Sequence, residues 1–520
     1  MFWTATVGVA LFAIALTAFL PSKDGGTAFP SNVPWAGRKK QIFASLRARC
    51  RELSAGTKPI KEGYEQYSKK NQLFILPGLT WCEVLVPPSQ IQWLVSQPES
   101  VLSVTSTQDD LLCLRYLAPG PFPDFAMDFT VIRRDLTRQL NKILPDVVDE
   151  LCASLDREWG LDDEQWVEKR IDSVEHAALR TANRVFFGKD LAQNEQFLQG
   201  IKRYHIAFAG VASLVRLLVP RIFMPLAARL LALPVKYLSR RLSQRSVLPM
   251  MNDMMPGVLN GHHTPDGDAK PNNIVQWMMY EAAGKGELTP SHARDIAAKA
   301  IFFNLFAVQT ISFTMMITLT SILTYADAAE LLAKLRAEAD TILPKILNDP
   351  TALREMVQTD SVIREAMRFH PMTVRALSRD VVQEGGLRTP DGTLLPQGTR
   401  VGTAAGCMMR DPEIMEGADR FEPMRFVPDE RNSEDGTSAV MKRQQMVNIN
   451  EHFLSFGLGK HACPGRFFAA QVMKLLLALM VTRYDIEPLK EPPKFFEIAD
   501  ITGPPGKTKI KVKRRTLVEQ

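Results

Sequence analysis

The hydrophobic pattern separates a short N-terminal segment from a long body. Residues 2–20 contain no charged side chain, and such a stretch is long enough to cross the hydrocarbon core of a bilayer as a helix. Basic residues at positions 38–40 follow it, which by the positive-inside rule places the body in the cytosol. We predict a single membrane anchor over residues 1–22 and a proline- and glycine-rich hinge over residues 23–40. A cleaved signal peptide is the alternative, but the basic residues that should precede its apolar stretch are missing.

The body of the chain mixes helical and β-type periodicity. Apolar residues recur at helical spacing through its middle, while two stretches read as strands and contain turn residues such as Pro77-Gly78. The predicted segments are β over 73–86, helical over 130–348, β over 381–401, irregular over 411–450 and helical over 467–481, followed by a short β tail. The chain has no internal repeat. We therefore predict one domain over residues 41–520, mainly α with small β-sheets.

Charge and cysteine content exclude several classes of protein. The net charge is +6, and no basic stripe is interleaved with aromatic residues, so the chain lacks the signature of nucleic-acid binding. The six cysteines show no paired or zinc-binding spacing, which argues against a disulfide framework and for a reducing compartment. The basic run from Lys507 to Arg515 alternates with apolar residues and predicts an edge strand rather than a binding tail.

One long apolar stretch lies inside the body, over residues 300–323. It is either a second membrane span or a buried central helix. Its middle carries the polar residues Asn304, Gln309 and Thr310, which are costly in lipid but can be satisfied inside a protein. We therefore predict a buried central helix.

The most informative segment is Phe456-Gly457-Leu458-Gly459-Lys460-His461-Ala462-Cys463-Pro464-Gly465, directly before the last long helix. A thiolate of Cys463 at a helix N-terminus is stabilised by free backbone N–H groups. The three glycines supply the backbone freedom for a tight loop, and Pro464 suits the first helical position. Such a site suits iron held by cysteine. The alternative is a buried structural cysteine.

This segment, continued by Arg466-Phe467-Phe468-Ala469, resembles the haem-ligand loop of the cytochrome P450 superfamily. The resemblance implies the cytochrome P450 fold, preceded here by one transmembrane helix. It also implies haem b as the cofactor, with Cys463 as the axial iron ligand. His461 is then placed to reach a haem propionate, and Phe456, Gly457, Gly459 and Gly465 would form the loop around the haem.

A second motif resembles the family's structural network. Glu365 and Arg368 are three residues apart in a helical segment, and Phe421-Glu422-Pro423-Met424-Arg425-Phe426 resembles the proline–x–arginine–phenylalanine motif. By resemblance, Glu365, Arg368 and Arg425 form a buried network that holds the irregular segment under the haem. An isolated Glu-x-x-Arg would be an exposed pair of little energetic value.

The stretch Phe306 to Ile311 is similar to the family's oxygen-activation motif. Thr310 falls on its first threonine, Gln309 replaces the usual acid, and Ile311 replaces the second threonine. The resemblance therefore implies that Thr310 and Gln309 guide protons to oxygen, with delivery differing in detail. A mid-helix threonine satisfied by its own backbone is the alternative.

Further arginines are candidates for the haem edge. Arg375 and Arg379 follow Pro371, where the family's chain passes the haem, and Arg379 is the better propionate candidate. Arg133, Arg134 and Arg138 either contact the haem, dock a reductase or form a solvated face. The apolar and basic segment over residues 197–238 resembles the part of anchored members that dips into the bilayer; a core helix is the alternative.

The resemblance implies a haem-dependent monooxygenase that uses O2 and electrons from NADPH through a reductase, with cytochrome b5 as a further candidate partner. The segment Ala182 to Gly188 is similar to fungal members near ent-kaurene oxidase. We therefore expect a fungal secondary-metabolite enzyme in the endoplasmic reticulum membrane that oxidises a lipophilic terpenoid or indole/diterpene-type intermediate. The alternatives are a haem-thiolate isomerase or dehydratase acting on a peroxide without reductase, and a non-catalytic membrane-tethered haem sensor.

Overall fold

The computed structural model describes residues 29–37, 57–78, 81–124, 129–219, 223–259, 272–428, 445–498 and 500–516. The predicted anchor over residues 1–22 lies outside these ranges and stays a prediction. The hinge is described only over residues 29–37, where Trp35 forms an isolated β-bridge with Ile75.

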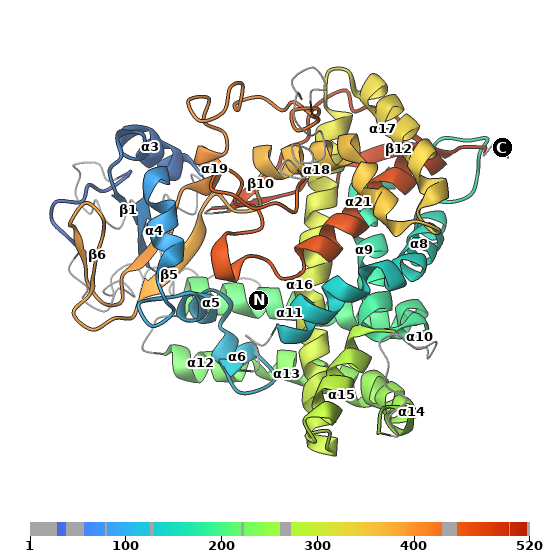
Figure 1. Ribbon diagram of the computed structural model, residues 1–520, viewed down its shortest axis with the longest axis horizontal. Coiled ribbons are helices and arrows are strands. Elements are labelled where there is room, and N and C mark those ends of the chain that lie inside the picture. The colour runs from blue at the N-terminus through green and yellow to red at the C-terminus, as the bar shows by residue number, and fades with distance from the viewer. Residues whose placement is uncertain are drawn as a thin grey trace, which may run out of the picture.

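The described residues are mostly helical, as the periodicity predicted. A central helix is surrounded by shorter ones, with a β-sheet on one side (Figure 1). The helices are α3 (Lys58–Gln66), α4 (Ile91–Ser96), α5 (Val104–Leu112), α6 (Leu114–Leu117), α8 (Thr137–Trp159), α9 (Val174–Phe187), α10 (Lys189–Gln193), α11 (Glu195–Leu218), α12 (Met224–Leu231), α13 (Leu233–Leu242), α14 (Leu248–Leu259), α15 (Ile274–Gly284), α16 (Pro290–Leu323), α17 (Ala328–Ile342), α18 (Val357–Phe369), α19 (Ala405–Met408) and α21 (Arg466–Arg483).

Helix α16 runs through the middle of the molecule (Figure 1). It begins where the Thr289 side chain accepts a hydrogen bond from the His292 N–H and Pro290 takes the first helical position. By length and composition it could cross a membrane, but 72% of its most apolar window is buried inside the protein. The prediction of a buried central helix over residues 300–323 is confirmed.

The larger sheet joins segments from both ends of the chain in the order β1-β2-β8-β5-β3. The predicted hairpin over residues 73–86 is confirmed, because β1 and β2 pair antiparallel with Phe74 opposite Leu85. β2 also pairs parallel to β8, with Glu83 opposite Arg400. The strands are β1 (Phe74–Pro77), β2 (Cys82–Val86), β3 (Leu102–Ser103), β5 (Ala376–Val381) and β8 (Arg400–Thr403).

The C-terminal basic run forms a strand, but the prediction of an edge strand is wrong. β12 (Lys509–Arg514) is the middle strand of a three-stranded sheet, between β4 (Val167–Arg170) and β9 (Tyr484–Ile486). Its Ile510 and Val512 side chains are buried. Alternation reports one buried face and does not reveal whether both strand edges are paired. The remaining short strands are β6 (Leu387–Arg388), β7 (Leu394–Leu395), β10 (Phe496–Ile498) and β11 (Ile501–Gly503).

Candidate active site

The loop around Cys463 turns tightly back on itself before α21. The Cys463 N–H donates a hydrogen bond of 2.8 Å to the Phe456 carbonyl. Gly457 and Gly459 both have φ of 72°, a left-handed conformation that glycine adopts without strain. Phe456 is buried beneath the loop. The sequence therefore folds locally into a turn that presents the sulfur at the start of a helix.

The structure corrects one detail of this loop. Helix α21 begins at Arg466 with Gly465 as its N-cap, so Pro464 precedes the cap and does not take the first helical position. Gly465 has φ of −93° and open space where a Cβ would lie. Gly465 lines the cavity that contains Cys463, so its role in binding the cofactor stays a prediction.

Two opposing influences act on the Cys463 sulfur. Burial is the larger and raises the pKa of the Cys463 thiol, while hydrogen bonds from the Gly465 and Arg466 backbone N–H groups oppose it. The Arg466 guanidinium also opposes it and donates a hydrogen bond of 3.0 Å to the Cys463 carbonyl. These backbone N–H groups can stabilise a negatively charged sulfur. A bound metal cation would favour the thiolate further, because it binds the deprotonated form of cysteine.

Cys463 and Thr310 line the same cavity, which has a volume of about 470 Å³. Most of its wall is apolar and aromatic, and α16 contributes three phenylalanines: Phe302, Phe303 and Phe306. The Thr310 hydroxyl donates a hydrogen bond of 2.9 Å to the Phe306 carbonyl. Gln309 is half-buried and does not line this cavity.

A second cavity, of about 290 Å³, is also bordered by the loop and is lined by Arg379, His461 and Gly457. Arg379 is only 2% exposed, and burial lowers its pKa. It donates a hydrogen bond of 2.8 Å to the Leu377 carbonyl, and it forms no ion pair with a carboxylate of the described residues. Burying a cation this way is costly, so the site is suited to an anionic group of a bound molecule.

His461 lies beside this buried cation. Its Nε2 is 3.4 Å from a Glu99 carboxylate oxygen. Burial is the main cause that lowers the pKa of His461, and the guanidinium groups of Arg379 and Arg133 lower it further. Arg133 is therefore near enough to His461 to influence its charge. Arg134 pairs instead with Asp135 and Glu281.

Arg375, the other arginine after Pro371, is held by two carboxylates of the protein. It forms ion pairs of 3.0 Å with Glu83 on β2 and 2.7 Å with Asp500. These partners lie far from Arg375 along the chain and belong to no local motif, so the sequence did not predict them. Their contacts leave Arg379 as the residue that fits a propionate.

These observations fit the implied cofactor. A sulfur at a helix start, an apolar cavity in front of it and a buried guanidinium beside the loop match the iron ligand, the ring and the carboxylates of haem b. The residues present are therefore able to hold a haem.

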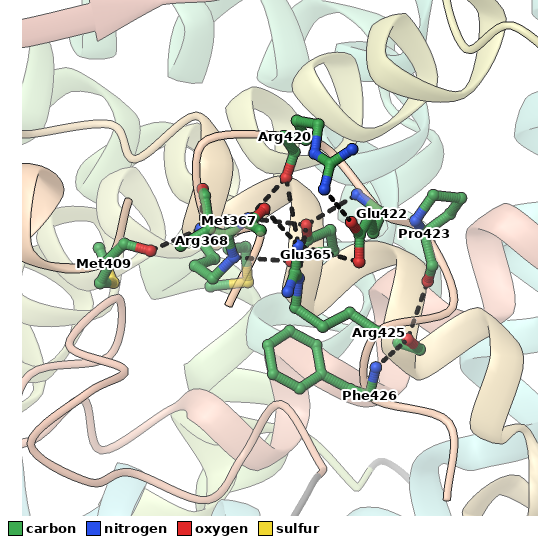
Figure 2. Close-up of polar contacts among 12 residues, drawn as sticks. Glu365, Met367, Arg368, Met409, Arg420, Glu422, Pro423, Arg425 and Phe426 are labelled. Carbon is green, nitrogen blue, oxygen red and sulfur yellow. Dashed lines mark hydrogen bonds and ion pairs between the residues drawn. The ribbon is translucent and has the colours of Figure 1, made fainter. Parts of the chain in front are cut away.

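The predicted Glu365–Arg368–Arg425 group comes together (Figure 2). Arg368 reaches both Glu365 oxygens at 2.7 Å, and both side chains are fully buried on α18. The Arg425 Nε lies 3.2 Å from a Glu365 oxygen. These contacts join the helix to the irregular segment that precedes the cysteine loop.

The backbone of that segment supplies the remaining partners. Arg368 donates to the carbonyls of Met409, Ala418 and Arg420, while the Glu422 N–H donates to Glu365 (Figure 2). A buried ion pair is stable only when its other polar atoms are also satisfied, and the irregular backbone provides this. The network therefore fixes the shape of residues 409–425.

Comparison with known proteins agrees with this geometry. The family model for Cytochrome P450 matches residues 128–512. The chain is 31% identical over 500 residues to the cytochrome P450 monooxygenase polB of Polytolypa hystricis, covering 94% of both chains. It is 31% identical over 519 residues to the cytochrome P450 monooxygenase lnaC of Aspergillus flavus, covering 98% of this chain and 97% of the relative. The chain therefore belongs to the cytochrome P450 family and is a haem-dependent monooxygenase.

Proposed function

We propose that this enzyme hydroxylates or otherwise oxidises a lipophilic natural-product intermediate of terpenoid or indole/diterpene type in fungal secondary metabolism. The observation that carries the proposal is the apolar cavity in which Cys463 and Thr310 lie among phenylalanine and leucine side chains. A haem ring would fill the part of this cavity next to Cys463, and the apolar wall of α16 would then bind a hydrocarbon body beside the cofactor through burial of apolar surface. The fungal source of the similar proteins supports a fungal pathway.

The residues of the loop would bind the cofactor. Cys463 would bind the iron of haem b, and this cofactor would supply the activation of O2, using electrons from NADPH delivered by a reductase, with or without cytochrome b5. Arg379 and His461 would hold its carboxylates. The N–H groups of Gly465 and Arg466 would stabilise the thiolate, as their hydrogen bonds to sulfur already oppose the effect of burial.

The chain's own contribution is to orient substrate, exclude water and hold a proton. The phenylalanines of α16 would restrict which face of a substrate approaches the bound cofactor. The Thr310 hydroxyl, held by the Phe306 carbonyl, can accept from water while it donates to the helix. Gln309 carries an amide in place of an acid, so it can orient water but cannot release a proton at neutral pH.

We also propose that the protein is anchored in the endoplasmic reticulum membrane with its catalytic part in the cytosol. Exposed apolar side chains gather on α12 and α13 and between α11 and α12, beside basic residues, and this supports contact with a lipid surface. They are Phe223, Leu226, Leu230, Leu233 and Tyr237, each 55% to 67% exposed.

The carbon monoxide difference spectrum of the dithionite-reduced protein tests the site. Wild type is expected to give the strongly red-shifted Soret band of thiolate-ligated haem, and Cys463→Ala is expected to lose it. Cys152→Ala, which removes a half-buried cysteine elsewhere, should keep it. A band typical of histidine ligation in wild type would overturn the role of Cys463.

Measurement of turnover then distinguishes a monooxygenase from an isomerase or dehydratase and from a sensor. Product that appears only with NADPH, reductase and O2 supports the monooxygenase proposal. Product from a peroxide substrate without reductase would indicate an isomerase or dehydratase instead. Haem binding without any product from a panel of terpenoids and indole diterpenes would favour a sensor.

A further inference from the structure

Helix α18 binds two consecutive residues of the segment that leads to the cysteine loop. The Arg364 guanidinium donates a hydrogen bond of 3.4 Å to the Gln445 carbonyl. The Asp360 Oδ1 accepts a hydrogen bond of 2.7 Å from the Met446 N–H. Both side chains are buried on α18, so water competes little for these hydrogen bonds. The contacts fix this part of the backbone relative to the helix.

The two side chains that bind this backbone are themselves held by further contacts. The Arg364 guanidinium packs 4.2 Å from the centroid of the Phe426 ring and 4.8 Å from that of the Phe453 ring. Asp360 lies 3.6 Å from the ammonium group of Lys474 on α21. The segment before the cysteine loop therefore has a fixed position relative to both α18 and α21.

Arg466 connects this fixed backbone to Cys463. Its Nε donates a hydrogen bond of 3.2 Å to the carbonyl of Val447, the residue after those bound by α18. Its Nη1 donates one of 3.0 Å to the Cys463 carbonyl. The guanidinium packs 4.5 Å from the centroid of the Phe467 ring, which leaves its N–H edge for acceptors. Because its donors lie in one rigid plane, a single side chain holds two carbonyls at a fixed separation.

Arg466 differs from the cations that were assigned to the carboxylates of the cofactor. Arg379 and His461 line the cavity of about 290 Å³. Arg466 lines neither that cavity nor the one that contains Cys463. A bound haem would therefore leave the contacts of Arg466 with the two carbonyls in place, and its charge would stay beside the loop.

We propose that Arg466 is a positioning residue for the haem thiolate, which fixes the Cys463 carbonyl to the segment before the loop and raises the reduction potential of a haem bound at Cys463. The proposal rests on Cys463 as the iron ligand and is independent of the substrate. The first effect follows from geometry, because the carbonyl cannot move without losing its hydrogen bond. The second follows from charge, because a cation near the thiolate favours the addition of an electron to the site.

The reduction potential of the full-length holoprotein, titrated with dithionite in the presence of redox mediators, tests the effect of charge. Arg466→Gln is expected to lower the equilibrium constant for one-electron reduction about tenfold, which is a shift of about 59 mV to lower potential. Arg466→Lys should stay close to wild type, because the positive charge remains.

The loss of thiolate ligation in urea tests the effect of geometry. At urea concentrations below those of global unfolding, the red-shifted Soret band of the reduced carbon monoxide complex should disappear about tenfold faster in Arg466→Gln. In Arg466→Lys the rate should lie between these two, since an ammonium group lacks the planar donor pair. Far-ultraviolet circular dichroism of the same samples should show global unfolding at the wild-type urea concentration.

Arg388→Gln is the matched control, because Arg388 is exposed and donates a hydrogen bond of 3.0 Å to a backbone carbonyl, that of Gly392, in another part of the fold. It should leave the potential and the rate unchanged. A wild-type potential in Arg466→Gln would overturn the effect of charge, and a wild-type rate would overturn the effect of geometry. If the Soret band and the dichroism changed together, Arg466 would serve general stability only.

These outcomes differ from a failure of the proposed function. If wild type itself lacked the red-shifted band, Cys463 would not be the iron ligand, and both proposals would be wrong. If wild type showed the band and Arg466→Gln behaved like wild type in both measurements, only the role of Arg466 would be wrong.

Discussion

His205 on α11 shows how burial of a single residue makes stability depend on pH. Its side chain is 2% exposed, and desolvation lowers the pKa of His205 to about 3, although Asn304 on α16 opposes this. The unfolded chain takes up a proton near pH 6.5 and the folded protein does not. The free energy of unfolding therefore falls as the pH drops below about 6.5, by up to about 1.4 kcal/mol per pH unit.

We expect His205→Gln to weaken that acid sensitivity. Urea unfolding of wild type and variant at pH about 7.5 and about 5.5 measures it. His176 gives the opposite case, because its hydrogen bond with Glu158 raises the pKa of His176. His176→Gln should therefore lose stability mainly on the acidic side. Equal pH dependence in wild type and His205→Gln would contradict the prediction.

Thr310 should affect the use of electrons more than the binding of haem. We expect Thr310→Ala to keep the Soret band and to lower the product formed per NADPH consumed by about tenfold, since proton transfer loses its hydroxyl. Thr318→Ala is the control, because that buried hydroxyl also bonds the carbonyl one turn back, at 2.8 Å. An unchanged product yield in Thr310→Ala would show that the hydroxyl serves mainly to donate a hydrogen bond to the Phe306 carbonyl.

Sequence motifs predicted the residues whose partners are local and missed those whose partners are distant. Cys463 and its loop form a turn within ten residues, so their arrangement could be inferred from the chain alone. The contacts of Arg375 with Glu83 and Asp500 join three separate parts of the sequence. No spacing rule links such positions. The same is true of Arg216 and Trp81, where the guanidinium packs 4.1 Å from the centroid of the ring.

At the scale of elements, the buried pair on α18 holds the irregular segment that leads to the cysteine loop. We expect Arg368→Met to lower the free energy of unfolding by about 3–5 kcal/mol, because it leaves the Glu365 charge buried with fewer partners. The haem content of the purified protein should fall as well. Denaturant unfolding and the Soret absorbance of the same samples measure both.

Arg420→Gln is the control for that prediction. The Arg420 side chain is exposed and lies 3.9 Å from Glu422, and only its backbone carbonyl joins the network. Its stability should stay within about 0.5 kcal/mol of wild type. If Glu365→Gln combined with Arg368→Met were as unstable as the single variant, an uncompensated buried charge would not be the cause.

The type of each long helix could be predicted more securely than its place among its neighbours. Apolar periodicity identified α16 and α21, and Asn304 and Thr310 correctly favoured burial of α16 over a membrane span. The sequence did not show that β12 is a middle strand or that Gly465 caps α21. Strand order and cap geometry depend on tertiary contacts that a one-dimensional pattern does not contain.

At the scale of the whole molecule, we predict two separate contacts with the membrane. Removal of residues 1–22 should leave the Soret band intact but only partly release the protein from vesicles, because the apolar residues of α12 and α13 remain. Adding Leu226→Asp and Leu230→Asp should weaken the remaining binding by about tenfold or more, given the loss of apolar burial. Vesicle flotation measures each step, and complete release by truncation alone would contradict the second contact.

The pairing of β2 with β8 has a consequence for synthesis of the protein. These neighbouring strands are separated by 317 residues, so the ribosome completes β2 on the order of half a minute before β8 emerges, at typical translation rates. During that interval one edge of the β1–β2 hairpin is an apolar template without its partner. Because slower elongation lengthens this interval, we expect the expression yield to fall when elongation is slowed and to rise when chaperones are supplied, with no change in the finished fold.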